Sequence, residues 1–238
     1  HKESLTEGDS HYWGVWWGEQ PFEIYNEKVG RFMSEYGFQG TPSLETTKSM
    51  FSGIPDLSLQ NSTIKAHEKH ARGWDIINEY LKRDYKIPTD FVQYNYLSQL
   101  LQAKGMQIAI EAHRRAKPYN MGTLYWQLND AWDGASWSTI EHNGTYKAAH
   151  YHLKRLYAPE IVLTEQVGDS IQVYFQTDRM DGAAGIFKAE IMDFKGRILS
   201  SYERPVNAGY LTAQLIYQQD VSKLVSGNAT GDYFLRNS

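Results

Sequence analysis

The pattern of apolar residues changes near Pro159, and this change restricts the fold more than any other feature of the chain. Before Pro159, apolar residues recur at helical spacing in three stretches, residues 61–84, 89–117 and 145–157. After it, apolar and polar residues alternate, as in strands with one buried face, in residues 170–176, 188–193 and 211–217. The sequence therefore predicts an α/β part followed by an all-β part.

Short strands are predicted between the helices of the first part. Residues 31–35 and 121–127 are the two candidates, and the second is too continuously apolar to be an edge that faces water. Residues 19–30 are typical of a short helix, with Pro21 near its start and Gly30 past its end. Strand, paired helices, strand and helix in this order indicate consecutive parallel units of an α/β barrel.

Local signals also mark where elements end. Residues 87–90 (IPTD) interrupt the helical pattern, and Thr89 or Asp90 is suited to cap the helix that follows. Pro118 closes that helix. In the second part, residues 194–197 (FKGR) predict a tight turn between two strands.

One carboxylate, Glu35, ends the predicted strand 31–35 directly before a Tyr-Gly turn. Aromatic-rich segments precede and follow it, residues 11–17 (HYWGVWW) and 122–130 (GTLYWQLND). Indole faces stack on the C–H faces of pyranose rings, and a carboxylate can stabilise or trap an oxocarbenium-like centre. A lone Glu at a strand end is usually a solvated surface charge. The flanking aromatic residues favour a sugar site instead.

Several long motifs resemble the β-mannosidases of glycoside hydrolase family 2. Residues 31–43 (RFMSEYGFQGTPS) are similar to the segment that carries the family's nucleophile, and residues 11–18 (HYWGVWWG) to the aromatic segment before it. Three further segments are similar to the family's last barrel strand and the helix after it: residues 122–132 (GTLYWQLNDAW), 135–141 (ASWSTIE) and 146–150 (YKAAH). This resemblance, which runs in order from about residue 8 to Pro159, implies a (β/α)8 barrel that acts on mannosides.

The same resemblance implies roles for individual residues. Glu35 would be the nucleophile that attacks the anomeric carbon, and water would release the sugar with retention of configuration. Trp126 would form a platform under the sugar, and Trp13 and Trp17 would line the same pocket. Core filling is the alternative for each tryptophan, and for Trp16 and Trp17 the two explanations are equally well supported.

A retaining glycosidase also needs a second carboxyl group, about 5–5.5 Å from the first, as general acid and base. In the resembled family this group is the Glu of an Asn-Glu pair that ends an earlier strand. The chain has two such pairs, Asn26-Glu27 on the predicted short helix and Asn78-Glu79 inside a helical pattern. Because neither follows an apolar strand, we expect the acid/base to be missing from this chain.

Polar residues follow the predicted strand 121–127. Asn129, Asp130 and Asp133 suit two roles, hydrogen bonds that order the loop or contacts with sugar hydroxyls. Loop ordering is the favoured role, and Asn129 and Asp130 remain candidate substrate-binding residues.

The histidines do not have the spacing of a metal site. His67 and His70 are one residue short of the separation that places both ligands of a zinc-protease helix on one face. His150 and His152 are two apart on a predicted helix and point to different faces. We therefore predict no metal site and no cofactor.

Composition argues against several other classes of protein. A net charge of −4 with 22% charged residues does not suggest nucleic acid as a partner, and no apolar run reaches membrane-spanning length. The absence of cysteine excludes a disulfide framework and thiolate metal sites. It does not fix the compartment, for which a periplasmic or secreted parent enzyme is favoured.

We expect the chain to be part of a longer enzyme, since it starts without Met and already deep in the barrel pattern. Residues 1–158 would be the C-terminal portion of a (β/α)8 TIM barrel, and residues 159–238 a truncated immunoglobulin-like β-sandwich. An open barrel edge would allow a homo-oligomer to form.

The expected activity is that of a retaining exo-β-mannosidase that releases terminal β-D-mannose from β-mannosides, and this chain alone is expected to be inactive. The alternatives within the family are a β-galactosidase, a β-glucuronidase or an exo-β-glucosaminidase. An alternative of another class is a non-catalytic carbohydrate-binding module.

Overall fold

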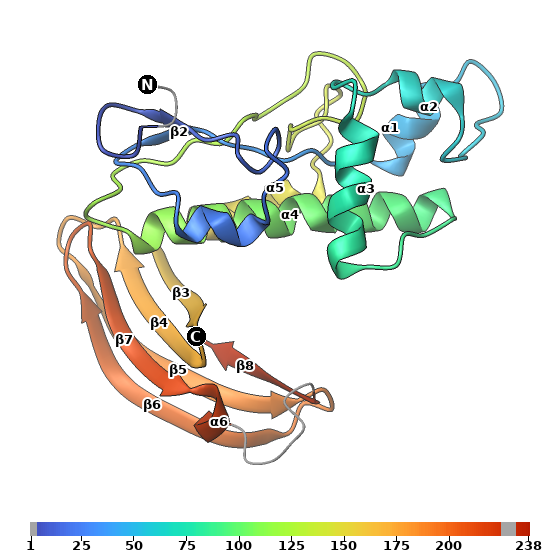
Figure 1. Cartoon of the computed structure of the whole chain (residues 1–238). Coiled ribbons are helices and arrows are strands. Elements are labelled where there is room, and N and C mark those ends of the chain that lie inside the picture. The colour runs from blue at the N-terminus through green and yellow to red at the C-terminus, as the bar shows by residue number, and fades with distance from the viewer. Residues whose placement is uncertain (1–3, 225–231) are drawn as a thin grey trace. The chain divides into compact units, whose positions relative to one another are not determined.

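The computed structural model describes residues 4–224 and 232–238 (Figure 1). The chain divides into two compact units. Unit 1 comprises His1–His113 and Gly122–Tyr157, and unit 2 comprises Arg114–Met121 and Ala158–Ser238. Helices dominate unit 1 and antiparallel strands dominate unit 2, as the change of pattern near Pro159 predicts.

The helical elements that begin in unit 1 are η1 (Phe22–Asn26), α1 (Leu44–Ser49), α2 (Ser62–Ala66), α3 (Gly73–Asp84), α4 (Phe91–Arg115) and α5 (Ala148–Leu156). Asp90 caps α4 as predicted, because its Oδ1 accepts a hydrogen bond from the backbone N–H of Gln93 at 2.9 Å. Within residues 4–224 and 232–238, no helix has both the length and the apolar character needed to cross a bilayer.

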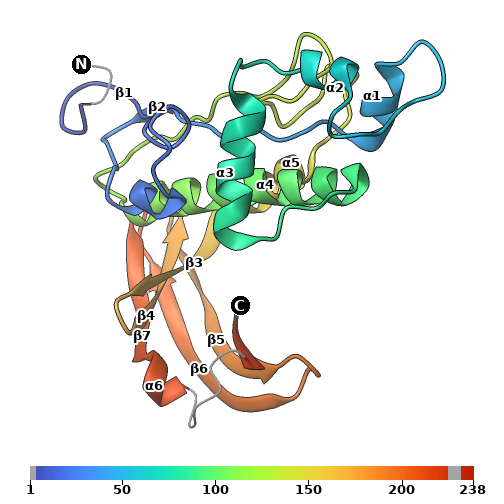
Figure 2. The same cartoon turned by 45° about the vertical axis from the view of Figure 1, so that its right-hand side comes forward.

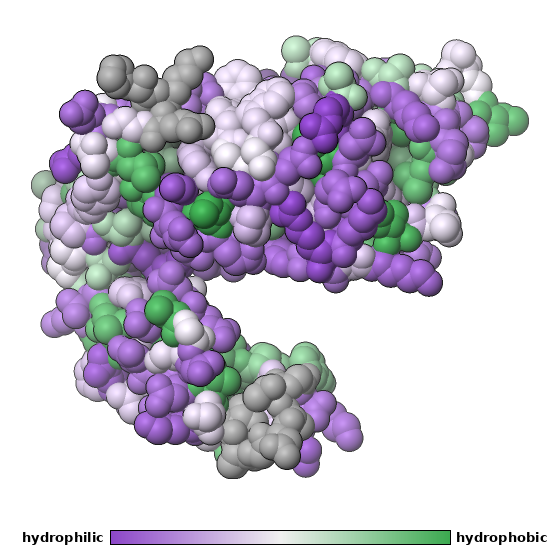
Figure 3. All heavy atoms as spheres, viewed as in Figure 1, coloured by the Kyte–Doolittle hydropathy of each residue, from purple (hydrophilic) through white to green (hydrophobic). Residues whose placement is uncertain are grey.

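Helix α3 crosses α4, as Figures 1 and 2 show. The hydroxyl of Tyr94 donates to Asn78 Oδ1 at 2.9 Å, and Lys104 pairs with Asp84 at 2.7 Å. The apolar face of α3 is buried, and it is formed by Ile76, Ile77, Tyr80 and Leu81. Hydrophilic side chains cover most of the visible surface around α3 in Figure 3, so the helix is amphipathic.

The predicted helix over residues 61–84 is wrong in its middle, because the chain leaves the helix between Ala66 and Gly73. The backbone there bonds to a distant loop instead. Ala135 N–H donates to His67 O at 2.8 Å, and Lys69 N–H donates to Ala135 O at 3.1 Å. A Cβ at residue 73 would collide with the Glu68 carboxylate, so glycine is required where α3 begins.

Two short parallel strands hold the candidate site. β1 (Ser10–His11) pairs with β2 (Met33–Glu35), which lies within the predicted strand 31–35. On its other side β2 meets residues 122–126, since Met33 N–H donates to Gly122 O at 2.9 Å and Leu124 N–H donates to Met33 O at 2.8 Å.

The predicted buried strand 121–127 is wrong in two respects. The segment forms a single parallel bridge, between Thr123 and Met33, rather than a continuous strand. It is also not buried, because Leu124 is 54% exposed and Trp126 is 43% exposed. Several apolar side chains of this segment face outward. A fully buried strand would have the same run of apolar residues, so the sequence could not distinguish the two cases.

Unit 2 contains two antiparallel three-stranded sheets. One has the order β3 (Glu160–Val167), β4 (Ser170–Thr177), β7 (Ala213–Asp220), and the other has the order β6 (Ile198–Ala208), β5 (Ala183–Asp193), β8 (Tyr233–Asn237). Helix α6 (Val221–Leu224) follows β7. The predictions for residues 170–176 and 188–193 are confirmed by β4 and β5, and residues 213–217 of the third prediction lie in β7.

Both sheets contribute to one hydrophobic core, which is formed by Val173, Phe175, Phe187, Ala189, Ala208 and Ile216. The turn predicted at residues 194–197 is present. Asp193 Oδ1 accepts hydrogen bonds from the N–H groups of Lys195 and Arg197, each at 2.9 Å, and Gly196 takes a φ of 83°.

A buried arginine at the end of α4 organises one edge of unit 2. Arg114 donates from Nε to Gln176 Oε1 at 2.6 Å, from Nη1 to Ala158 O at 2.7 Å and from Nη2 to Asp178 Oδ2 at 3.1 Å. Its side chain is 3% exposed. Each of these bonds satisfies a group that would otherwise lose its partner on folding.

Replacement of Arg114 by leucine should lower the free energy of unfolding by about 2–3 kcal/mol, because it leaves the buried Gln176 Oε1 without its donor and removes one of the donors to Asp178, which keeps Lys117. Urea denaturation followed by circular dichroism would measure the loss. Arg179→Leu is the control, since Arg179 pairs with Asp181 and Glu160 at the surface and should matter little. Equal losses in the two variants would contradict the structural role of Arg114.

Candidate active site

Glu35 is contacted by one hydrogen-bond donor and one imidazole of the neighbouring segment. Trp13 Nε1–H donates to Glu35 Oε2 at 3.1 Å, and His11 Nδ1 lies 3.2 Å from the same oxygen. The pairing of β1 with β2 explains this arrangement, because it sets His11 opposite Glu35. Among the residues that the structure describes, none bonds to Oε1. The Glu35 side chain is 29% exposed, so Oε1 is available to a ligand.

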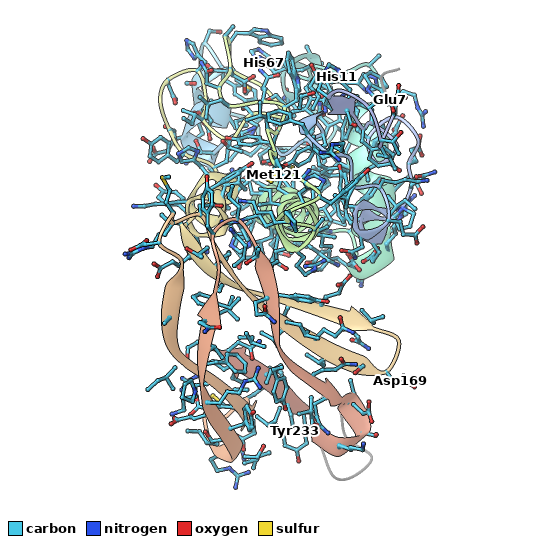
Figure 4. The ribbon with its side chains drawn as sticks, turned by 90° about the vertical axis from the view of Figure 1, so that its left-hand side faces the viewer. Glu7, His11, His67, Met121, Asp169 and Tyr233 are labelled. Carbon is cyan, nitrogen blue, oxygen red and sulfur yellow. The ribbon has the colours of Figure 1, made fainter. Side chains whose placement is uncertain are left out.

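His11, which Figure 4 labels, connects Glu35 to a second carboxylate. His11 Nε2 lies 3.5 Å from Asp9 Oδ2, and the hydroxyl of Ser34 donates to Asp9 Oδ2 at 2.6 Å. The hydrogen bond from Ser34 is the main cause that lowers the pKa of Asp9.

Sequence reasoning missed His11, although one signal pointed to it. His11 and Trp13 are two residues apart, and side chains at this spacing share one face of an extended chain. Trp13 was a candidate because of its aromatic ring. The two-residue spacing then makes His11 a candidate for the same site.

The three tryptophans of residues 13–17 have different environments. Trp13 contacts Glu35, as expected for a residue that lines the site. Trp16 is fully buried, with its ring 5.1 Å from that of Phe38, so core filling describes it. Trp17 is 56% exposed and packs edge-on against His70 at 4.5 Å. The structure thus brings Trp13 to Glu35 and shows no contact between Trp17 and Glu35.

Trp126 is fixed beside the residue that follows Glu35. Its backbone N–H donates to Tyr36 O at 2.8 Å, and its carbonyl oxygen occupies the space where a Cβ at Gly37 would lie. Glycine is therefore required at position 37 by this close approach. The peptide bond between Trp126 and Gln127 is cis. The Trp126 side chain is 43% exposed and could take a ligand on its ring.

Asp130 is buried, and its contacts favour the loop-ordering role. Its Oδ1 pairs with Lys69 Nζ at 3.1 Å, and its Oδ2 accepts hydrogen bonds from the hydroxyls of Ser136 and Ser138. Asn129 is exposed, and its carbonyl oxygen accepts from Gln127 Nε2 at 2.9 Å. Asn129 therefore remains the more accessible of the two candidates.

The histidines expected to lie outside a metal site have separate partners. His67, also labelled in Figure 4, places Nδ1 2.9 Å from Asp133 O, and the ring of His70 packs against Trp17. His150 Nδ1 lies 3.1 Å from Thr139 Oγ1. Within the part of the chain that the structure describes, no three His, Asp or Glu side chains are grouped so that they could hold a metal ion.

Comparison with known proteins finds relatives of this chain among the β-mannosidases. No family model matches the chain. Beta-mannosidase A of Emericella nidulans is 28% identical over 232 residues, which cover 85% of this chain and 24% of that protein. The beta-mannosidase of Capra hircus is 31% identical over 73% of this chain and 21% of its own length.

A solved structure agrees with these relatives. The beta-D-mannosidase of Dictyoglomus thermophilum superposes with a TM-score of 0.90 at 26% identity, over 99% of this chain and 29% of that one. The chain is related to the β-mannosidases. The resemblance carried by residues 8–159 is confirmed, and the chain spans about a quarter of the length of the β-mannosidases that it matches.

A more distant structure shares the fold alone. The exo-chitosanase CsxA of Amycolatopsis orientalis superposes with a TM-score of 0.64 at 18% identity, over 98% of this chain and 28% of its own. The mixed helix and strand architecture is therefore common to both proteins.

Two ionisable groups of this chain, the fully buried Lys147 and the partly exposed Glu68, were not anticipated from its sequence. Lys147 is fully buried and donates to Gly40 O at 3.0 Å, and burial lowers its pKa to about 8. Burial likewise raises the pKa of Glu68 to about 8, against the opposing effect of a hydrogen bond from the His70 N–H. Lys147 ties Gly40 to the loop that contains Asp130, since it also lies 3.4 Å from Ser136 O.

Glu68 should make the stability depend on pH. Because its folded pKa is raised from 4.5 to about 8, the protonated form is favoured in the folded state. Its contribution is complete below its unfolded pKa and is lost as the pH rises through about 8. Glu68→Gln should remove this part of the pH dependence, as measured by urea unfolding at several pH values.

The control for this measurement is Glu45→Gln, at an exposed position of α1. It should leave the pH profile of the unfolding free energy as it is in the parent. A Glu68→Gln profile parallel to that of the parent would show that Glu68 does not titrate in this window.

Proposed function

We propose that this chain carries the nucleophile of a retaining exo-β-mannosidase, and that the nucleophile is Glu35. The observation that supports this most directly is the asymmetric environment of its carboxylate. Trp13 and His11 both lie on Oε2, and Oε1 is left for a substrate. The similarity to β-mannosidases adds the class of sugar.

In the proposed mechanism Glu35 Oε1 attacks the anomeric carbon of a terminal β-mannoside. The bond from that carbon to the leaving oxygen breaks, and its electron pair stays on the leaving oxygen, which a general acid protonates. The resulting glycosyl ester is cleaved by water, which attacks the same carbon while a base takes its proton. The hydrogen bond from Trp13 and the contact with His11, both on Oε2, fix the rotation of the carboxylate, so that Oε1 keeps its position for attack.

The general acid/base of this mechanism comes from a part of the enzyme outside residues 1–238. Glu27 is exposed at the end of η1, and Glu79 is exposed in the interior of α3, where it pairs with Lys82 at 2.6 Å. Neither residue follows a strand, in agreement with their rejection from sequence. The chain alone should therefore not hydrolyse aryl β-mannosides.

The fold proposed for this function is the late part of a (β/α)8 barrel over residues 1–158, followed by an immunoglobulin-like β-sandwich over 159–238. Parallel pairing of β1, β2 and the segment at Thr123 supports the first assignment, together with α3 and α4 between the last two. The two antiparallel sheets with a common core support the second.

The competing sugar specificities are weaker alternatives. The curated relatives reported above are named as β-mannosidases, whereas the exo-chitosanase shares only the fold with this chain. A non-catalytic sugar-binding module would not need a carboxylate with one oxygen contacted by Trp13 and His11 and the other left open.

Glu35→Gln should abolish β-mannosidase activity in the complete enzyme, because the amide is a poor nucleophile of almost the same volume. The melting temperature should change little, which differential scanning fluorimetry would confirm. Glu27→Gln is the control and should retain activity. Turnover by Glu35→Gln at the parent rate would refute the assignment.

Trp126→Ala should weaken the binding of a mannose-configured inhibitor by about 1–3 kcal/mol, through lost stacking and apolar contact. Isothermal titration calorimetry on the complete enzyme would measure this. Trp132→Ala is a closely matched control, since Trp132 is 44% exposed against 43% for Trp126. If both variants bound the inhibitor equally well, Trp126 would not be the platform.

A further inference from the structure

A chain of hydroxyl and imidazole groups lies directly beside the candidate nucleophile. Tyr36 Oη is 2.6 Å from Thr123 Oγ1, and Thr123 Oγ1 is 2.8 Å from His113 Nδ1. Tyr36 and His113 are fully buried, and their rings are 4.8 Å apart. The hydroxyl of Tyr157 donates to Thr123 O at 3.2 Å. These groups join β2, the segment after Gly122 and helix α4.

This network is on the opposite face of the chain from the candidate site. Glu35 and Tyr36 are adjacent, so their side chains point to opposite faces of an extended strand. Their contacts agree, because Glu35 meets His11 and Trp13 whereas Tyr36 meets Thr123 and the ring of Tyr25. The network can therefore hold the strand without blocking a substrate.

Few backbone hydrogen bonds fix the register between β2 and residues 122–126. β2 has three residues, and its bonds to the neighbouring segment come from Met33 and continue at Tyr36 O, which accepts from Trp126 N–H at 2.8 Å. A slip of one residue would turn Glu35 away from the site. It would also remove the buried Tyr36 hydroxyl from Thr123 and leave it without this hydrogen-bond partner.

The network does not depend on ionisation of its phenol. Burial raises the pKa of Tyr36 well above its ordinary range, so the hydroxyl stays protonated and neutral. The Thr123 hydroxyl can donate one hydrogen bond and accept another. It can therefore bond to Tyr36 and His113 at the same time. A hydroxyl at position 123 is therefore the common element of both bonds.

We propose that Thr123 is a positioning residue, whose hydroxyl locks β2 in the register that places Glu35 against Trp13 and beside the Trp126 backbone. This role rests on the function proposed for Glu35. It predicts that loss of one hydroxyl, on the far face of the strand, displaces a carboxylate that it does not touch.

A second network in unit 1 provides a matched control. Tyr125 Oη lies 2.6 Å from Thr139 Oγ1, and Thr139 Oγ1 lies 3.1 Å from His150 Nδ1. It has the same three residue types, but it includes neither a residue of β2 nor Tyr36, which directly follows β2. Thr139→Val therefore removes the same chemistry as Thr123→Val at another place in the unit.

The first test uses the 238-residue chain and requires no catalysis. The indole N–H resonance of Trp13, assigned by its loss in Trp13→Phe, reports the bond from Trp13 to Glu35. Thr123→Val should shift this resonance, and Tyr36→Phe should do so as a second variant in case the first does not fold. Thr123→Ser, which keeps the hydroxyl, and Thr139→Val should leave it in place. An unmoved resonance in Thr123→Val, or an equal shift in Thr139→Val, would overturn the proposal.

The second test uses the complete enzyme and a 2-deoxy-2-fluoro-mannosyl fluoride, with the labelled peptide identified by mass spectrometry. Thr123→Val should be labelled at Glu35 about tenfold or more slowly than the parent, and Thr123→Ser should restore the rate. Equal rates in Thr123→Val and the parent would refute the positioning role. Absence of label at Glu35 in the parent would instead refute the function proposed for Glu35, and the Trp13 resonance would still decide the role of Thr123.

Discussion

The hydrogen bonds that hold β2 between β1 and residues 122–126 are the constraint on which the candidate site depends. Through them Tyr12 N–H donates to Glu35 O at 2.8 Å, and Trp126 N–H donates to Tyr36 O at 2.8 Å. One strand of three residues thereby collects His11 and Trp13 from one side and Trp126 from the other. The chemistry proposed for Glu35 follows from this convergence, since no single segment contains the site.

Features set by local pattern could be predicted from the sequence. Alternation located β4 and β5, and Asp90 marked the start of α4 because an N-cap needs only a residue three positions along the chain. Glu35 was found because a strand end and its flanking aromatic residues are visible in the sequence. The similarity to β-mannosidases rests on long motifs, which periodicity alone could not reveal.

Features set by distant partners could not be predicted in this way. The helix breaks after Ala66 because the next residues bond to Ala135, which is far away in sequence. Residues 121–127 resemble a buried strand in composition, yet Leu124 and Trp126 are exposed. The contact of His11 with Glu35 depends on the pairing of β1 with β2, so only the spacing of His11 from Trp13 pointed to it in the sequence.

The central claim is that Glu35 Oε1 is the attacking atom, held in place by the contacts that Trp13 and His11 make with Oε2. A crystal structure of the complete enzyme trapped with a 2-fluoro-mannosyl group would test it directly. The account predicts a covalent bond from the anomeric carbon to Glu35 Oε1, with Trp13 Nε1 and His11 Nδ1 still on Oε2. A sugar attached to any other carboxylate, or to the Glu35 oxygen that Trp13 and His11 contact, would contradict it.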